Sequence, residues 1–260
     1  MKGEERIKGL SIKVGPLGEN DRLLTLLTYQ EGIIRVAVPG ARRPKSNLAA
    51  AAALTFLELQ ISGTTSLKRI RQMKVLKSFS KLGEQIESLA AAQVMTELCL
   101  LIVGMNDPQP KILETILFHL DRLEKRRVDP CFTLGNCIQS CVHLLVLGGY
   151  SIPLNNCCLS GMPLDPPIGN WNWLCSFLPT EGFAIGSIPD SKIKLNASEL
   201  ALLQRLIKPN LPIKKDGELM GPIDVWIKLL AIIDEWIEIH LNKSLSSLKI
   251  LRQTYKEYIL

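Results

Sequence analysis

The sequence predicts an α+β protein of two domains: a β-barrel over residues 1–80, then a mainly α-helical domain over residues 81–260. Three observations lead to this prediction. Short apolar runs separated by turn residues fill the first 80 residues, as is typical of strands. From about Gly83 onward, apolar residues recur at helical spacing instead. Positive charge is concentrated in the first of these two regions.

The N-terminal region contains five apolar runs that are compatible with strands. Pro16 and Gly18 form a turn after the first run, and Gln30-Glu31-Gly32 form a turn before the third. Five strands with short connections suit a small closed barrel of the OB-fold type, and an SH3-like barrel fits nearly as well. The alanines of LAAAAALTF leave open a helical turn before the fourth strand. The runs are GLSIKVG (9–15), RLLTLLTY (22–29), IIRVAV (33–38), LTFLELQISG (54–63) and SLKRIRQMKVLKSF (66–79).

The C-terminal region contains six segments with the spacing of helices. Asn196 and Glu199 suit a capping box at the start of the fourth segment. Residues 151–195 are rich in Pro, Gly, Asn and Trp and too long for a simple connection, so we expect an irregular insert there. The expected helices cover residues 84–103, 110–127, 130–147, 198–207, 223–241 and 245–255.

Composition excludes several classes of protein. No run reaches the roughly 18 uninterrupted apolar residues of a membrane span, and the first residues lack the apolar stretch of a secretory signal. A cytoplasmic, nucleoid-associated protein with no membrane partner is therefore expected. Seven cysteines, several in apolar helical contexts, indicate reduced thiols. The chain has no phosphate-binding Gly-Lys-Ser/Thr loop and no His-Glu-x-x-His motif, so we expect a binding protein rather than an enzyme.

The positive charge of the chain lies near its N-terminus. Residues 1–80 hold 14 Lys plus Arg against 6 Asp plus Glu, a net of 14 − 6 = +8. The remaining residues hold 31 − 14 = 17 against 25 − 6 = 19, a net of −2. Localised positive charge is expected of a module that binds a polyanion such as DNA, although a solvated basic surface gives the same count.

Candidate DNA contacts follow from the placement of these cations. Arg42, Arg43 and Lys45 lie in a loop with Gly40 and Pro44, which we expect to be extended and exposed. Arg35 alternates with the apolar residues of its strand and should project outward. Of the cations in the last strand, the strongest candidates are Lys68, Arg69 and Arg71. Simple alternation puts Lys68 and Lys74 on one face, with Arg69, Arg71 and Lys77 on the other. A solvated strand or loop has the same pattern.

Aromatic residues that could stack on bases are scarce in the barrel, namely Tyr29, Phe56 and Phe79. Binding would then depend on phosphates, with little sequence preference and a strong dependence on salt.

The run GENDRLLTLLTYQEGIIRVAVPGARRPKS, residues 18–46, resembles the RecO family of bacterial recombination mediators. The later FLELQ and the Leu-Gly-Gly-Tyr helix end at residues 147–150 support the resemblance. It implies an N-terminal OB-fold and a helical C-terminal domain. It also implies binding of single- and double-stranded DNA, annealing of complementary strands, and partnership with RecR and with the C-terminal tail of single-stranded DNA-binding protein (SSB).

The resemblance breaks down at the zinc module of many family members, Cys-x-x-Cys-Gly followed by Gly-Gly-x-x-Cys-x-x-Cys. Here Cys157 matches the first ligand and Ser160 replaces the second, while Gly186 and Pro189 stand at the other two positions. Because a structural zinc site needs four N or S ligands, we expect no zinc and no other cofactor. A makeshift metal site is the alternative; without a metal, the loop must be held by packing. The makeshift ligands would be Cys157, Cys158, Cys175 and His143, and the packing anchors Trp171, Trp173 and Phe177.

The leading functional hypothesis is a non-catalytic DNA-annealing and mediator protein of recombinational repair. Two alternatives remain: an RNA-binding OB-fold module, and an interaction scaffold whose basic barrel contacts an acidic protein.

Overall fold

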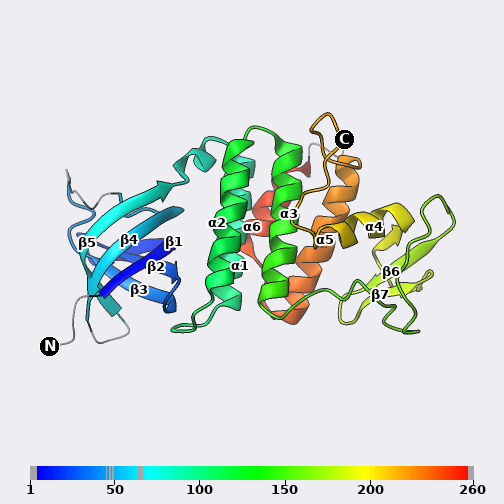
Figure 1. Cartoon of the computed structure of the whole chain (residues 1–260), viewed down its shortest axis with the longest axis horizontal. Coiled ribbons are helices and arrows are strands. Elements are labelled where there is room, and N and C mark those ends of the chain that lie inside the picture. The colour runs from blue at the N-terminus through cyan, green and yellow to red at the C-terminus, as the bar shows by residue number, and fades with distance from the viewer. Residues whose placement is uncertain (1–4, 45, 47, 49, 64–66, 257–260) are drawn as a thin grey trace. The chain divides into compact units, whose positions relative to one another are not determined.

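A computed structural model describes residues 5–44, 46, 48, 50–63 and 67–256 (Figure 1). Contacts divide the chain into two compact units, residues 1–125 and residues 126–260. The first two long helices therefore group with the barrel. The expected domain boundary near residue 80 remains a prediction.

The first unit contains the predicted barrel, which confirms the fold class. Five strands close in the order β1-β2-β3-β5-β4, with β3 and β5 parallel and all other pairs antiparallel. This order is that of an OB-fold. All five predicted strands form, although the first is longer than expected. The strands are β1 (Glu5–Leu17), β2 (Asp21–Thr28), β3 (Gly32–Val38), β4 (Thr55–Ser62) and β5 (Leu67–Ser78).

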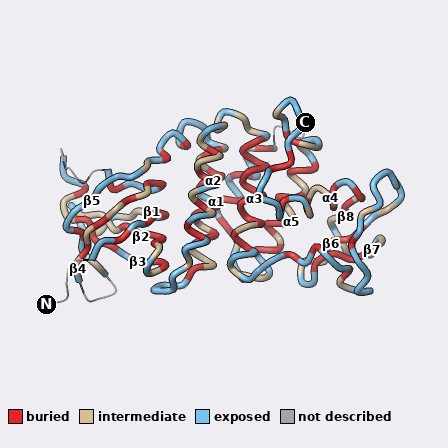
Figure 2. Tube along the Cα trace, viewed as in Figure 1, coloured by how far each residue is buried: buried red, intermediate tan, exposed pale blue. Residues whose placement is uncertain are grey.

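Apolar side chains fill the barrel because alternate strand residues point inward. In Figure 2 buried residues lie along the strands, and the turns between them are more exposed. A fully buried aliphatic side chain contributes roughly 1.5–3 kcal/mol. The interior cluster includes Ile7, Leu24, Leu26, Ile34, Val36, Val38, Leu57, Leu59, Ile61 and Ile70.

Part of the outer surface of the barrel is also buried. Leu10, Leu27 and Ile33 are cross-strand neighbours outside the interior cluster, and none is more than 5% exposed. Strands β1 and β2 contact the helices α1 (Ile86–Ile102) and α2 (Pro110–Lys125), which follow the short 3-10 helix η1 (Ser80–Glu84). The helices thus cover one part of the barrel, while outward residues such as Lys13 and Arg35 are exposed.

The second unit is built around α3 (Pro130–Leu147) and α5 (Ile223–His240), which contact each other. Asp129 caps α3 by accepting a hydrogen bond from the Phe132 amide, with Pro130 as the first helical residue. Helix α3 is long and apolar enough to cross a membrane, but 72% of it is buried inside the protein, which is typical of a core helix.

The shorter helices of this unit are α4 (Ala197–Arg205) and α6 (Ser246–Thr254). The predicted capping box forms, because the side chains of Asn196 and Glu199 each accept a hydrogen bond from the other's backbone amide. Helix α6 is tied to α5 by the ion pair between Arg252 and Asp234, at 2.9 Å.

The insert at residues 151–195 is less irregular than predicted. Residues 151–173 contain only isolated bridges and turns, as expected. The remainder forms a three-stranded sheet in the order β7-β6-β8. Its strands are β6 (Leu174–Leu178), β7 (Gly182–Ile185) and β8 (Lys194–Asn196). At three to five residues each, these strands are too short to produce a recognisable alternating pattern in the sequence.

Candidate nucleic-acid interface

The exposed part of the barrel carries a row of outward side chains across four strands. Lys13 of β1 pairs with Thr25 of β2, Thr25 with Arg35 of β3, and Arg35 with Leu67 of β5. Cross-strand partners point to the same side of a sheet. Arg35 is exposed, as the sequence predicted, and so is Lys13.

A second row lies two residues further along β3. There Leu23 pairs with Ala37, and Ala37 pairs with Arg69. The exposed Arg69 therefore lies on the same face as Arg35, on the adjacent strand. The two rows are about 6.6 Å apart along the strands, the spacing of residues i and i+2. We refer to Lys13, Arg35 and Arg69 as the basic face.

Strand β5 does not alternate regularly, and this corrects the predicted assignment of its cations to faces. Ile61 pairs with Ile70 and Gln60 with Gln72, which makes Arg71 an extra residue in a β-bulge. One extra residue reverses which side chains point outward. Lys74 therefore shares the outer face with Arg69 rather than with Lys68. Arg71 is exposed, and its Nε donates to Ser62 Oγ at 2.9 Å.

Lys68 differs from the other predicted contacts because carboxylates already surround it. Its ammonium group forms an ion pair with Glu31 in the turn between β2 and β3, and a second with Glu5 at 3.7 Å. Only 16% of the Lys68 side chain is exposed. A phosphate would have to compete with both carboxylates, so Lys68 is the weakest candidate among the predicted residues.

The basic loop, residues 39–54, joins β3 to β4. It is exposed at Arg42 and Arg43 but is folded into turns rather than extended as predicted. The Arg43 amide donates to Gly40 O at 3.0 Å, and Gly40 adopts a φ of +65° that favours glycine. The Arg42 guanidinium donates to Gly18 O at 3.1 Å, which leaves further N–H donors available. Lys45, the third predicted cation, lies outside the described residues.

The arginines of the basic face and loop have no local neutralising partner among the described residues. The ion pairs of the described barrel residues involve Lys8, Lys68 and Lys77. Arg35, Arg69 and Arg42 have no carboxylate within 4.0 Å among the residues that the structure describes. The surface can therefore bind phosphates without first breaking ion pairs.

Two family models match the chain: Recombination protein O N terminal over residues 1–79, and Recombination protein O C terminal over residues 83–249. The chain belongs to the RecO family.

Curated relatives from cyanobacteria agree with this assignment. The chain is 56% identical to "DNA repair protein RecO" of Prochlorococcus marinus (strain MIT 9303), an alignment that covers 97% of the chain and 96% of that protein. Proteins of the same name from Synechococcus sp. (strain CC9605) and Trichodesmium erythraeum (strain IMS101) are 54% and 30% identical. These two alignments cover 96% of the chain, and 97% and 94% of the relatives.

The loop at the position of the RecO zinc module is held around one buried thiol. Cys157 Sγ accepts hydrogen bonds from the amides of Ser160, at 3.4 Å, and Ile185, at 3.3 Å. Burial raises the pKa of this thiol, but hydrogen bonds to the sulfur outweigh burial and lower the pKa to about 7. Within the described part of the chain, no group of three or more His, Cys, Asp or Glu side chains could hold a metal ion.

Aromatic packing also stabilises this loop, through Phe177 but not through Trp171. Phe177 is buried and contacts Phe183 and Trp236, with ring centroids 5.2 Å and 6.4 Å apart. Trp171 is 88% exposed, so its predicted role as an anchor is wrong. The tryptophan lies in a turn before β6, and sequence alone does not show which way such a side chain points.

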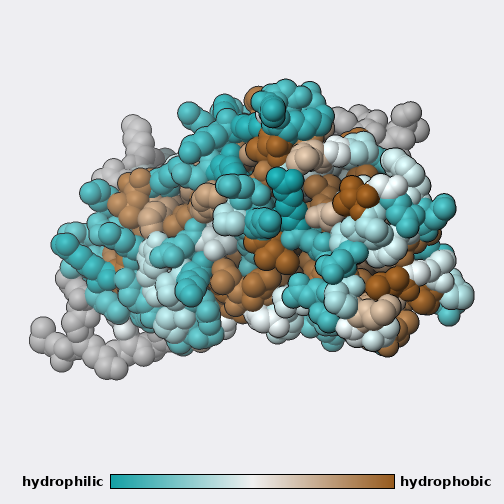
Figure 3. Space-filling view, turned by 45° about the vertical axis from the view of Figure 1, so that its right-hand side comes forward, coloured by the Kyte–Doolittle hydropathy of each residue, from teal (hydrophilic) through white to brown (hydrophobic). Residues whose placement is uncertain are grey.

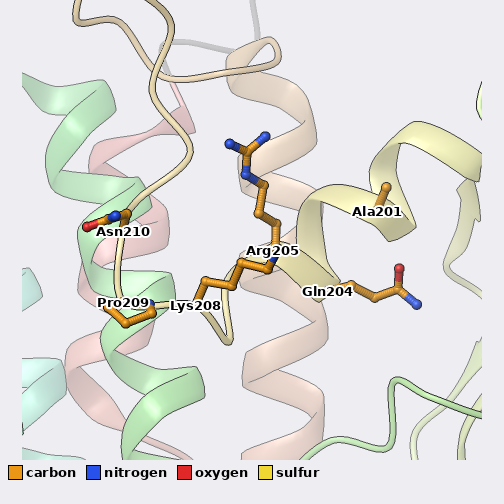
Figure 4. Close-up of a pocket in the computed structure, with 6 residues that line it drawn as sticks. All are labelled: Ala201, Gln204, Arg205, Lys208, Pro209 and Asn210. Atoms are coloured by element: carbon orange, nitrogen blue, oxygen red, sulfur yellow. The ribbon is translucent and has the colours of Figure 1, made fainter.

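The second unit has a surface groove that the sequence did not reveal. A cavity of about 360 Å³ is lined mainly by apolar residues, including Val142, Ile152 and Ile207. Hydrophobic residues also reach the visible surface of the molecule in several separate patches (Figure 3). Next to Ile207, Arg205 and Lys208 line a second cavity of about 530 Å³ (Figure 4). The only signal in the sequence is the pair of cations at the end of α4, in RLIKPN.

Proposed function

We propose that the chain is a non-catalytic DNA-binding protein of recombinational repair. It binds single- and double-stranded DNA and anneals complementary strands. The observation that carries this proposal is the basic face with its adjoining loop, whose arginines have no carboxylate partner among the described residues. Membership of the RecO family, whose curated relatives are named DNA repair proteins, supports it.

The mechanism is charge neutralisation. Arginine and lysine contacts release the counterions of each strand, and two strands held this way repel each other less. Between the cations, the outward residues of the two rows are Thr25, Leu23, Ala37 and Leu67, none of which stacks on bases. The bases therefore remain free to pair, and binding is independent of sequence.

Strand annealing with complementary, fluorescently labelled oligonucleotides tests this proposal. Arg42→Ala/Arg43→Ala/Lys45→Ala should anneal several-fold more slowly than wild type, because three phosphate contacts are lost. Lys243→Ala/Lys249→Ala/Lys215→Ala, in the second unit, is a control that removes the same charge. Equal loss in both variants would mean that net charge, rather than the basic loop, drives annealing.

The binding of oligonucleotides distinguishes the two alternatives. An RNA-binding module would bind ribose oligomers more tightly than deoxyribose oligomers, because it would contact the 2′-hydroxyl. A scaffold for an acidic protein would neither bind nor anneal DNA even at low salt, where charge-driven binding is strongest.

We further propose that the second unit recruits RecR and SSB, so that a recombinase can load on SSB-coated DNA. The acidic C-terminal tail of SSB would need an apolar groove beside cations. The apolar groove that Ile207 lines, and the separate cavity that Arg205 and Lys208 line, support this proposal. Arg126 fits less well, because it is paired with Asp129 at 2.5 Å. Arg205→Glu/Lys208→Glu should abolish binding of a labelled tail peptide and leave annealing of bare DNA intact. Unchanged peptide binding would exclude this groove.

A further inference from the structure

The β1–β2 hairpin holds the basic loop at both ends. Near the start of the loop, Asp21 Oδ1 accepts a hydrogen bond from the Gly40 amide at 2.8 Å. Near the end of the loop, Arg22 Nη1 donates to Ala51 O at 2.9 Å.

Two further bonds join the same hairpin to the loop. The Arg42 amide donates to Asn20 O at 2.9 Å, and the Arg42 guanidinium donates to Gly18 O. Ala41 and Ala51 anchor the loop in the barrel interior, where they are 2% and 0% exposed. Both ends of the loop are therefore fixed, and Arg42 and Arg43 lie on the surface beyond the first anchor.

We infer that Asp21 and Arg22 are positioning residues for the basic loop: they hold Gly40 and Ala51, so that Arg42 and Arg43 are presented to a nucleic-acid backbone. This inference rests on the proposed DNA-binding function. A loop of 16 residues, 39–54, would otherwise sample many conformations, and each phosphate contact would carry the entropic cost of ordering it. A loop that is already ordered before DNA binds has a lower entropic cost of binding.

Asp21 allows a test in which positioning and charge predict opposite results. Removing a carboxylate beside a basic loop should tighten DNA binding if only charge matters, because the local potential becomes more positive. If Asp21 positions the loop, loss of its oxygen acceptor should weaken binding instead. Asp21→Asn removes the charge but retains an oxygen at Oδ1, whereas Asp21→Ala removes both.

The experiment measures binding of a single-stranded oligonucleotide by fluorescence anisotropy, together with hydrogen exchange of the Gly40 amide. We expect Asp21→Ala to weaken binding about three- to tenfold, as the loss of one hydrogen bond allows. Asp21→Asn should bind at least as tightly as wild type. Exchange at Gly40 should accelerate in Asp21→Ala alone. Glu19→Ala, in the same hairpin, is the matched control, and its loss of negative charge should not weaken binding.

Two outcomes would overturn the inference. Equal or tighter binding by Asp21→Ala would show that the hydrogen bond to Gly40 does not position the contacts. Equal weakening in Asp21→Ala and Asp21→Asn would show that an acceptor oxygen at this position is not sufficient to position the loop. Failure of the DNA-binding proposal is recognised separately: Arg42→Ala/Arg43→Ala/Lys45→Ala would bind as wild type does, while exchange at Gly40 would still report the hydrogen bond.

Discussion

Arg69 and Arg35 lie on the same outer face of two adjacent parallel strands, because Arg69 pairs with Ala37, two residues beyond Arg35. The two residues are more than 30 positions apart in sequence and share a face only because the barrel closes between β3 and β5. This pair links the two rows of the basic face.

Loss of this pair should lower the salt dependence of DNA binding. Arg35→Ala/Arg69→Ala removes two candidate phosphate contacts, and each contact to a single strand contributes about 0.7 to the slope of log K against log salt. We expect the slope to fall by about 1.4, measured by anisotropy over a range of salt concentrations. Lys243→Ala/Lys249→Ala is the control with equal loss of charge. An unchanged slope would exclude this pair from the DNA path.

Substitution of Lys68 should affect stability more than DNA binding. Lys68→Ala leaves the mostly buried carboxylate of Glu31 without its ion-pair partner. Breaking such a pair is destabilising, and we expect a decrease of about 2 kcal/mol in the free energy of unfolding by urea. A double-mutant cycle with Glu31→Ala should show coupling between the two residues. Strongly reduced DNA affinity with unchanged stability would instead make Lys68 a phosphate contact.

Zinc should be absent from the purified protein. Cys157 is the one residue that matches a ligand of the RecO zinc module, and a stable site needs four ligands. We expect less than stoichiometric zinc by elemental analysis and no change in Tm on addition of a chelator. One zinc per chain, lost together with stability in Cys157→Ser, would contradict this expectation.

The Cys157 thiol should make stability depend on pH. Its pKa is lowered to about 7 in the folded protein, from 9.0 for an unperturbed thiol. The folded state therefore favours the thiolate, and the resulting stability is present above the unfolded pKa and lost as pH falls through the folded pKa. Between pH 7 and pH 9, the free energy of unfolding of wild type should rise relative to that of Cys157→Ser. Parallel curves for the two proteins would show that Cys157 does not titrate in this range.

Local patterns were sufficient for most of the secondary structure. The five strands follow from short apolar runs between turn residues such as Gly18 and Gly32, and the capping box at Asn196 follows from its own residue types. The three short strands after residue 173 could not be predicted, because each is too short to show a period. The packing role predicted for Trp171 was wrong, because an aromatic side chain in a turn can point toward the core or toward solvent.

The sequence predicted the individual residues of the candidate interface but not how they are arranged on the protein surface. The sequence alone determined which residues are cationic, that Arg35 alternates outward in its strand, and that the chain resembles the RecO family. Only the tertiary structure decided which cations remain available. The bulge at Arg71 reverses which side chains of β5 point outward. Lys68 forms an ion pair with Glu31. Asp21 and Arg22 form hydrogen bonds that hold the basic loop. These outcomes depend on strand register and on contacts between distant segments, which local sequence patterns do not encode.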